Sequence, residues 1–172
     1  MLIAIESSKF NFSINKEILS MYKRLTLGIV ILALTGVGVV SAQMDPIKAA
    51  IQYRQSVMKI VGWNIGPLAG MVKGKMAFDA AVFEKNAGRM ATMLPMALEG
   101  FVDGSDTGDT RAKPEIWSNM DDVKEKLNNA VTEARKLAEV ATGGDEAAIK
   151  AQFAATGKAC GACHKKYRKK KK

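Results

Sequence analysis

The sequence of 172 residues contains very little of the side chains that most often bind metals: one histidine and two cysteines. A structural zinc site takes four ligands, usually Cys and His, so these three side chains do not complete one. Aromatic residues are also scarce, at 6% of the chain. No segment alternates apolar and polar residues as a half-buried strand does, which argues against a sheet. The βαβ setting of a thioredoxin-like cysteine pair is therefore missing as well.

All three of these residues fall in one run, Cys160-Gly161-Ala162-Cys163-His164. Cys-X-X-Cys-His is the run at which haem is covalently attached in c-type cytochromes. Each thiol adds to one haem vinyl group, and His164 follows closely enough to bring an imidazole nitrogen to the iron. Because the chain has no other histidine, the sixth iron position belongs to methionine, to a weaker ligand or to none. A Cys160–Cys163 disulfide, for which a helix offers poor geometry, and a chance match are the alternatives.

The N-terminal region predicts export. Residues 21–42 have the pattern of a secretory signal peptide, with a charged start at Met21–Arg24, an apolar run at Leu25–Val40 and small residues before the cleavage point. This run is short for a membrane span, although an uncleaved anchor is the alternative. We expect residues 43–172 to form a single periplasmic domain with no stable membrane anchor. Residues 1–20 are expected to be an upstream over-extension of the reading frame.

The excess of positive charge is concentrated at the C-terminus. The formal net charge is +9, and seven of the 26 basic residues lie in Lys165–Lys172. Residues 43–164 carry 15 bases and 15 acids, so this body is formally neutral. A nucleic-acid-binding face would spread its bases among aromatic residues, so no nucleic-acid partner is expected. The tail is expected to be a solvated, frayed helix end, and salt-dependent steering of an acidic redox partner is the alternative.

Apolar residues recur at spacings of three and four in four segments, which predicts helices. The segments run from Asp45-Pro46 to Lys73-Gly74-Lys75, from Asp79 to Phe101, from Pro114 or Ser118 to Thr142, and onward from Asp145. Pro67 and Pro95 predict bends, and Val102–Lys113 reads as a polar loop. Helices joined by short loops predict an all-α, antiparallel four-helix bundle with the cofactor in its core.

The first helix carries two candidate cofactor contacts, Arg54 and Met58, four residues apart on its apolar face. The predicted face consists of Ile47, Ile51, Arg54, Met58, Val61, Ile65, Leu68 and Val72. An arginine in an apolar seam needs a charged partner, and a haem propionate supplies one. Met58 is either an apolar filler or an iron ligand.

Together these segments resemble the class II c-type cytochromes, and cytochrome c′ most closely. The likeness spans the mature chain and rests on Tyr53–Ser56, Met71–Gly74, Phe78–Ala81, Lys113–Trp117 and Cys160–Arg168. It implies a left-twisted four-helix bundle with one covalently attached haem c per chain. It also implies a location in the bacterial periplasm and, commonly, a homodimer formed through the first two helices.

The resemblance also implies roles for individual residues. His164 is expected to be the only protein ligand of a five-coordinate, high-spin iron, with Met58 covering its other face. Arg54 and Gln55 are expected near the propionates and Arg168 near the proximal histidine. The loop before the third helix approaches the haem edge in the family, and Asp109 is the residue expected there. Low-spin members of the class ligate the iron with a methionine from the first helix, so ligation by Met58 stays open.

The expected function is the binding of small diatomic gases, chiefly NO and CO, together with or instead of one-electron transfer to periplasmic redox partners. A low-spin electron-transfer cytochrome with His164 and Met58 as ligands is the alternative. An enzyme such as a peroxidase needs a polar acid–base group above the iron. The one histidine is already assigned to the proximal side, so no enzymatic activity is expected.

Overall fold

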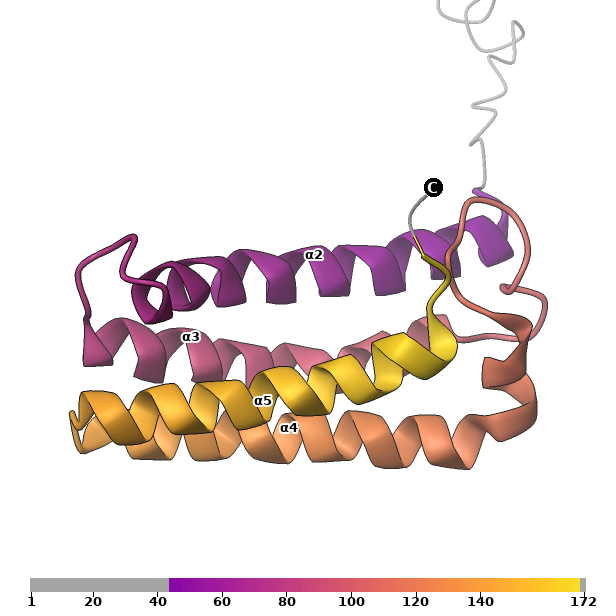
Figure 1. Ribbon diagram of the computed structural model, residues 1–172. Helices are drawn as coiled ribbons and strands as arrows, with labels where there is room; N and C mark the ends of the chain where they lie inside the picture. Colours follow the sequence, from indigo (N-terminus) through magenta and orange to yellow (C-terminus); the bar gives the residue numbers. More distant parts are fainter. Residues whose placement is uncertain (1–43, 171–172) are drawn as a thin grey trace, which may run out of the picture. The chain divides into compact units, whose positions relative to one another are not determined.

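The computed structural model describes residues 44–170 (Figure 1). The predicted over-extension, signal peptide and mature start, and the last two lysines, lie outside the described residues. Within the described chain the helices are α2 (Pro46–Val72), α3 (Ala80–Met93), the 3₁₀ helices η1 (Leu94–Gly100) and η2 (Pro114–Asn119), α4 (Met120–Thr142) and α5 (Glu146–Tyr167). None of the helices between residues 44 and 170 is long and apolar enough to cross a membrane.

The helix ends follow from local chemistry that the sequence already displays. Asp45, Asp79 and Asp145 each cap a helix by accepting backbone N–H groups of its first turn. Gly74 and Gly144 follow α2 and α4 with φ of 67° and 72°, a backbone conformation that other residues rarely adopt. The predicted starts and ends of these helices are thereby confirmed.

The second helix differs from the prediction, because it is not α-helical as far as Phe101. The α-helix ends at Met93, and the chain continues as the 3₁₀ helix η1, in which Pro95 is the second residue. This tighter segment packs directly on the backbone of α2. A Cβ atom on Gly100 would lie only 2.7 Å from the Ala50 carbonyl oxygen, so the close approach requires glycine at this position.

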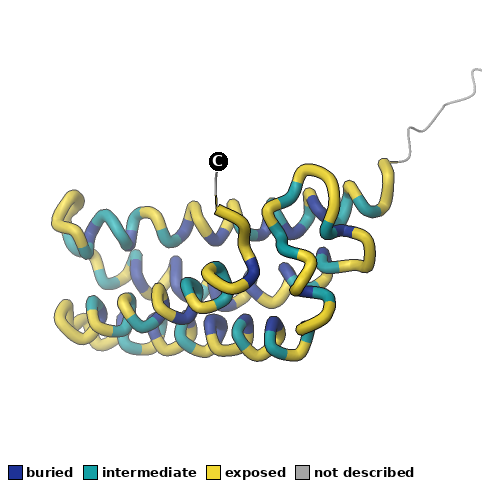
Figure 2. The backbone as a smooth tube through the Cα atoms, turned by 45° about the vertical axis from the view of Figure 1, so that its right-hand side comes forward, coloured by how far each residue is buried: buried dark blue, intermediate teal, exposed yellow. Residues whose placement is uncertain are grey.

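The four α-helices of the described chain form an antiparallel bundle, as predicted (Figure 1). α3 packs on α4, α4 packs on α5, and α2 packs on α3 and η1. In Figure 2 the buried positions lie mainly on the sides of the helices that face one another. The largest fully buried side chains include Phe83, Leu68 and Leu137, and the Phe83 ring meets the Phe153 ring edge-on at 6.0 Å.

The buried face of α2 is rotated slightly from the predicted one. Its buried residues are Ile51, Arg54, Val57, Val61, Asn64, Leu68 and Met71. Met58, Ile65 and Val72, which the sequence pattern placed on the seam, are only half-buried. Asn64 was overlooked because it is polar, yet it is 4% exposed. Its side-chain amide donates a 2.8 Å hydrogen bond to the Ile60 carbonyl, and its backbone carbonyl accepts one of 3.1 Å from the Asn86 side chain. Met58 therefore lies at the edge of the core.

Candidate haem-binding site

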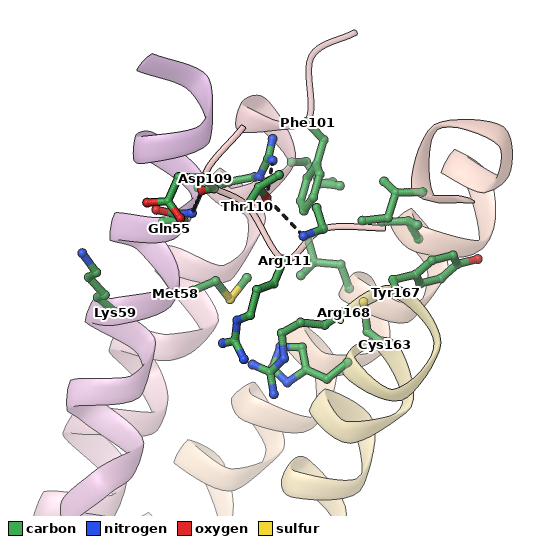
Figure 3. Close-up of a pocket in the computed structure, with 17 residues that line it drawn as sticks. Gln55, Met58, Lys59, Phe101, Asp109, Thr110, Arg111, Cys163, Tyr167 and Arg168 are labelled. Atoms are coloured by element: carbon green, nitrogen blue, oxygen red, sulfur yellow. Dashed lines mark hydrogen bonds between the residues drawn. The ribbon is translucent and has the colours of Figure 1, made fainter. Parts of the chain in front are cut away.

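A cavity of about 570 Å³ opens between α2, the loop before η2 and the C-terminal end of α5 (Figure 3). Its apolar wall is formed by Leu98, Phe101, Ile116, Val123 and Leu127. α2 and α5 face each other across this space. Single-ligand pockets commonly have volumes of roughly 300–1,000 Å³ and mainly apolar walls with a few polar groups, so the cavity has the character of a cofactor site.

The Cys-X-X-Cys-His run supplies the α5 wall of the cavity. Cys163 and His164 line the cavity directly, whereas Cys160 lies one turn earlier and packs against the main apolar core. Both cysteines are half-buried free thiols. The structure therefore contains no disulfide between Cys160 and Cys163.

Burial and nearby cations act on the histidine in the same direction. Burial lowers the pKa of His164, and the neighbouring Arg168 and Arg111 guanidinium groups lower it further. The neutral imidazole is therefore favoured, and this is the form in which histidine binds a metal. Among residues 44–170 no group of three or more His, Cys, Asp or Glu side chains could hold a metal ion by itself.

The opposite wall comes from α2, where Met58 projects into the cavity with its sulfur toward the Arg111 side chain (Figure 3). Gln55 and Lys59 line the cavity on either side of it. The Gln55 amide donates a 2.7 Å hydrogen bond to the backbone carbonyl of Asp109. The structure thus brings together Gln55, Met58 and Asp109, three of the predicted site residues.

Arg54 is 4% exposed and contacts the loop through both terminal nitrogens of its guanidinium group. One donates to the Gly100 carbonyl and the Ser105 hydroxyl, each at 2.6 Å. The other donates to the Ser105 carbonyl and, at 2.9 Å, to the Thr110 hydroxyl. The guanidinium also lies 4.9 Å from the centre of the Phe101 ring. Loop oxygens thus surround the cation where the sequence suggested a propionate partner, and Arg54 still lines the cavity.

The C-terminal tail is solvated as predicted, since Arg168, Lys169 and Lys170 are exposed, but as far as Lys170 it does not fray. α5 ends at Tyr167, and Arg168 forms an isolated antiparallel bridge with Ala112. The Lys169 backbone N–H donates to the Arg111 carbonyl at 2.8 Å. This pairing brings Arg168 and Arg111 side by side at the cavity (Figure 3). The sequence prediction missed Arg111, and its place in the polar loop before the third helix was the available signal.

A second contact, also missed, fixes the end of α5 to the start of α4. Tyr167 is 2% exposed, and its hydroxyl donates to the carboxylate of Asp122. Lys166 and Lys126 lie 3.0 Å and 3.1 Å from the same carboxylate. The Tyr167 hydrogen bond, followed by those from Lys166 and Lys126, holds the pKa of Asp122 well below its ordinary value.

Replacing Asp122 by Asn should therefore change how stability depends on pH. A carboxyl group whose pKa is lowered by folding stabilises the protein above its unfolded pKa of about 3.9, and this contribution is lost as pH falls toward the folded pKa. We expect Asp122→Asn to lower the melting temperature near pH 7, and the difference from the unmutated protein to shrink as pH falls below about 3.9 toward the lowered pKa of the folded protein. Asp121→Asn is the control, because Asp121 is fully exposed and only 3.6 Å from Lys124. Equal effects of the two variants on thermal unfolding near pH 7 would contradict this role.

The residues around the cavity fit haem c. Two free thiols and one imidazole lie within about one turn of the same helix, with Cys160 one turn before Cys163 and His164. The apolar wall suits a porphyrin ring, and four cationic side chains in the lining, Arg54, Lys59, Arg111 and Arg168, face only one carboxylate, that of Asp109. This imbalance suits a ligand with two carboxylates of its own.

Comparison with known proteins agrees with this arrangement. The sequence profile described as Cytochrome C' matches residues 49–168. The cytochrome c' of Rubrivivax gelatinosus is 37% identical over 122 residues, covering 70% of this chain and 95% of its own. The cytochrome c prime structure from Shewanella frigidimarina superposes with a TM-score of 0.69 at 40% identity, covering 74% of this chain and 98% of that one.

A further solved structure is a nitric oxide complex of a cytochrome c prime variant from Alcaligenes xylosoxidans. It has a TM-score of 0.66 and 34% identity, and it covers 74% of this chain and 98% of its own. Members of this family bind haem c covalently, and both cysteines required for that attachment are present here. The profile match spans well over half of the sequence, so the chain belongs to the cytochrome c′ family of class II c-type cytochromes.

Proposed function

We propose that this chain is a periplasmic cytochrome whose haem binds small diatomic gases, chiefly NO and CO, and exchanges single electrons. Cys160 and Cys163 are the proposed attachment points, and His164 is the proposed axial ligand. When bound, the haem supplies an iron that takes up a gas molecule or an electron. The nitric oxide complex of the Alcaligenes xylosoxidans relative supports the first of these roles.

The observation that carries the proposal is the position of Met58 opposite His164 across the cavity. Met58 is half-buried and does not belong to the fully buried face of α2, and a methionine side chain has three rotatable bonds. It can therefore cover the distal side and still swing away from a small ligand. Leu98 and Phe101 contribute to the apolar wall of the cavity, which suits a small, uncharged ligand.

The cavity lining also supports a role without acid–base catalysis. Among the described residues that line it, His164 is the one imidazole, and its proposed place is on the proximal side. Met58, Leu98 and Phe101 carry no group that transfers protons at neutral pH. Arg54, Gln55 and Asp109 remain the proposed contacts at the haem edge, with Arg168 beside the proximal histidine.

A low-spin electron-transfer site with Met58 as the sixth ligand is the alternative, and it is favoured by the direction of the Met58 sulfur into the cavity. We expect Met58→Leu to leave the ferric and ferrous visible spectra almost unchanged and to keep ready CO binding by the ferrous protein. A methionine–iron charge-transfer band in the unmutated ferric protein, lost in Met58→Leu, would overturn the open site. Absence of that band together with CO binding would overturn the simple carrier.

We also propose that the chain forms a homodimer through α2. Trp63 is 82% exposed and Ile60 is 43% exposed, and they are three positions apart, so they lie on the same outer face of the helix. A large, exposed aromatic side chain on a helix is typical of a protein interface rather than of a solvated surface.

Trp63→Glu should weaken this dimer at least tenfold, which corresponds to about 1.4 kcal/mol. The charged side chain has to be desolvated if the dimer is to form, and the aromatic contact is lost. Sedimentation equilibrium of the holoprotein measures the dissociation constant, and Trp63→Phe, which keeps an aromatic ring, is the matched control. A monomeric unmutated protein, or a dimer unaffected by Trp63→Glu, would contradict the interface.

A further inference from the structure

The basic residues of the C-terminus lie at the mouth of the cavity rather than on a free tail. The backbone bridge between Ala112 and Arg168 and the 2.8 Å hydrogen bond from Lys169 to Arg111 hold this segment against the loop. Arg168 and Arg111 line the cavity, Lys59 lines it from α2, and the exposed Lys169 and Lys170 follow Arg168 directly in the chain. We call these five residues the cationic collar.

The collar has more positive charge than its surroundings neutralise. None of its five members forms a salt bridge with another residue in the described part of the chain, and all five are exposed. Asp109 is the carboxylate that lines the same cavity. Even if both haem propionates pair with collar residues, a net positive charge remains, and Lys171 and Lys172 follow in the sequence.

We propose that the cationic collar is the docking surface for an acidic electron-transfer protein. This inference rests on the proposed one-electron function, since docking there brings a partner to the haem edge. Surface charges of one sign raise the encounter rate with an oppositely charged partner by about ten- to a thousandfold at low salt. Residues 43–164, which include Lys59 and Arg111, are formally neutral as a whole, so the collar is a local concentration of positive charge that can orient such an encounter.

An acidic protein fits the collar better than an anionic membrane does. Peripheral membrane binding usually combines basic residues with apolar side chains that enter the bilayer. The large hydrophobic side chains that are exposed in residues 44–170 are Met44, Ile60, Trp63, Met76, Met96 and Val102. None of them belongs to the collar, so the collar offers charge without an apolar anchor.

The test reverses two collar charges that do not line the cavity, Lys169→Glu with Lys170→Glu. The probe is a plant-type [2Fe–2S] ferredoxin, a small acidic electron-transfer protein. We expect its second-order rate of haem reduction to fall about tenfold at 10 mM ionic strength, where the Debye length is roughly 30 Å, and to converge with the unmutated rate near 1 M salt. Titration with oxidised ferredoxin should show the same loss of affinity without any electron transfer.

The matched control is Lys73→Glu with Lys75→Glu, which makes the same change in net charge in the turn between α2 and α3, at the other end of the bundle (Figure 1). We expect less than a twofold effect on rate and affinity. Equal losses in the two double variants would overturn the collar, because net charge alone would then explain them. No loss in the collar variant would overturn it as well.

Two further outcomes keep this proposal separate from the proposed function. If dithionite does not reduce the haem of the holoprotein, one-electron transfer is refuted. Binding of oxidised ferredoxin would still report on the collar in that case. Binding to phosphatidylglycerol vesicles at 150 mM salt that is lost in the collar variant, with unchanged ferredoxin affinity, would assign the collar to a membrane instead.

Discussion

Replacing Cys160 and Cys163 together by alanine should abolish covalent haem attachment. Each thiol is proposed to form one thioether bond, so each single variant should retain haem through the other cysteine, and only the double variant should lose it completely. Denaturing gel electrophoresis with haem staining and the mass of the intact protein measure the attached haem. Both side chains are only half-buried, so the double substitution should leave the helical bundle folded.

His164→Ala is the control that separates attachment from ligation. We expect this variant to keep its thioether-linked haem, so that its mass is that of the variant polypeptide plus one haem, and to change its visible spectrum because the axial imidazole is lost. Haem that stays covalently bound in the double cysteine variant would contradict the assignment of this run. A His164→Ala spectrum identical to that of the unmutated protein would contradict only the ligand.

The helices and the α5 part of the site could be predicted because the information for them is local. Asp45 and Asp145 cap helices by contacting backbone groups two or three residues away. Cys163 and His164 both reach the cavity and are neighbours in one helix, with Cys160 one turn earlier. Such features depend on spacing within one segment, and spacing is visible in the sequence.

The register of α2 was less predictable, because apolar periodicity alone does not count a polar core residue. Asn64 belongs to the buried face, where its side-chain amide donates to the Ile60 carbonyl one turn earlier in α2, and the half-buried Met58 then falls at the cavity edge. The change to a 3₁₀ helix after Met93 depends equally on packing, since Gly100 has to approach the backbone of α2.

The tail and the loop could not be predicted, because what fixes them is distant in sequence. Seven bases in eight residues suggest a solvated end, but the Ala112–Arg168 bridge joins segments more than fifty residues apart. Arg54 presents the same problem in another form. Its position in an apolar seam predicted a need for polar partners, and carbonyl and hydroxyl oxygens of the loop provide them.

Arg54→Leu should lower the free energy of unfolding by about 3–4 kcal/mol. The substitution leaves the buried carbonyl groups of Gly100 and Ser105 without their donor, and each unsatisfied buried group costs about 1–3 kcal/mol. The leucine side chain recovers part of this loss by filling the apolar space beside Phe101. Denaturant unfolding of the holoprotein measures the change, and hydrogen exchange of the loop amides from Phe101 to Lys113 should accelerate, because Arg54 ties the loop to α2.

Gln55→Ala is the matched control, since it removes a single exposed hydrogen bond between the same helix and the same loop. We expect it to cost no more than about 1 kcal/mol. Arg54→Lys should fall between the two variants, because an ammonium group keeps the charge but lacks the planar, forked geometry that reaches several acceptors at once. If Arg54→Leu is no more destabilising than Gln55→Ala, Arg54 does not clamp the loop, and a propionate becomes its principal partner. Arg54→Leu would then change the reduction potential of the haem and leave the free energy of unfolding of the protein nearly unchanged.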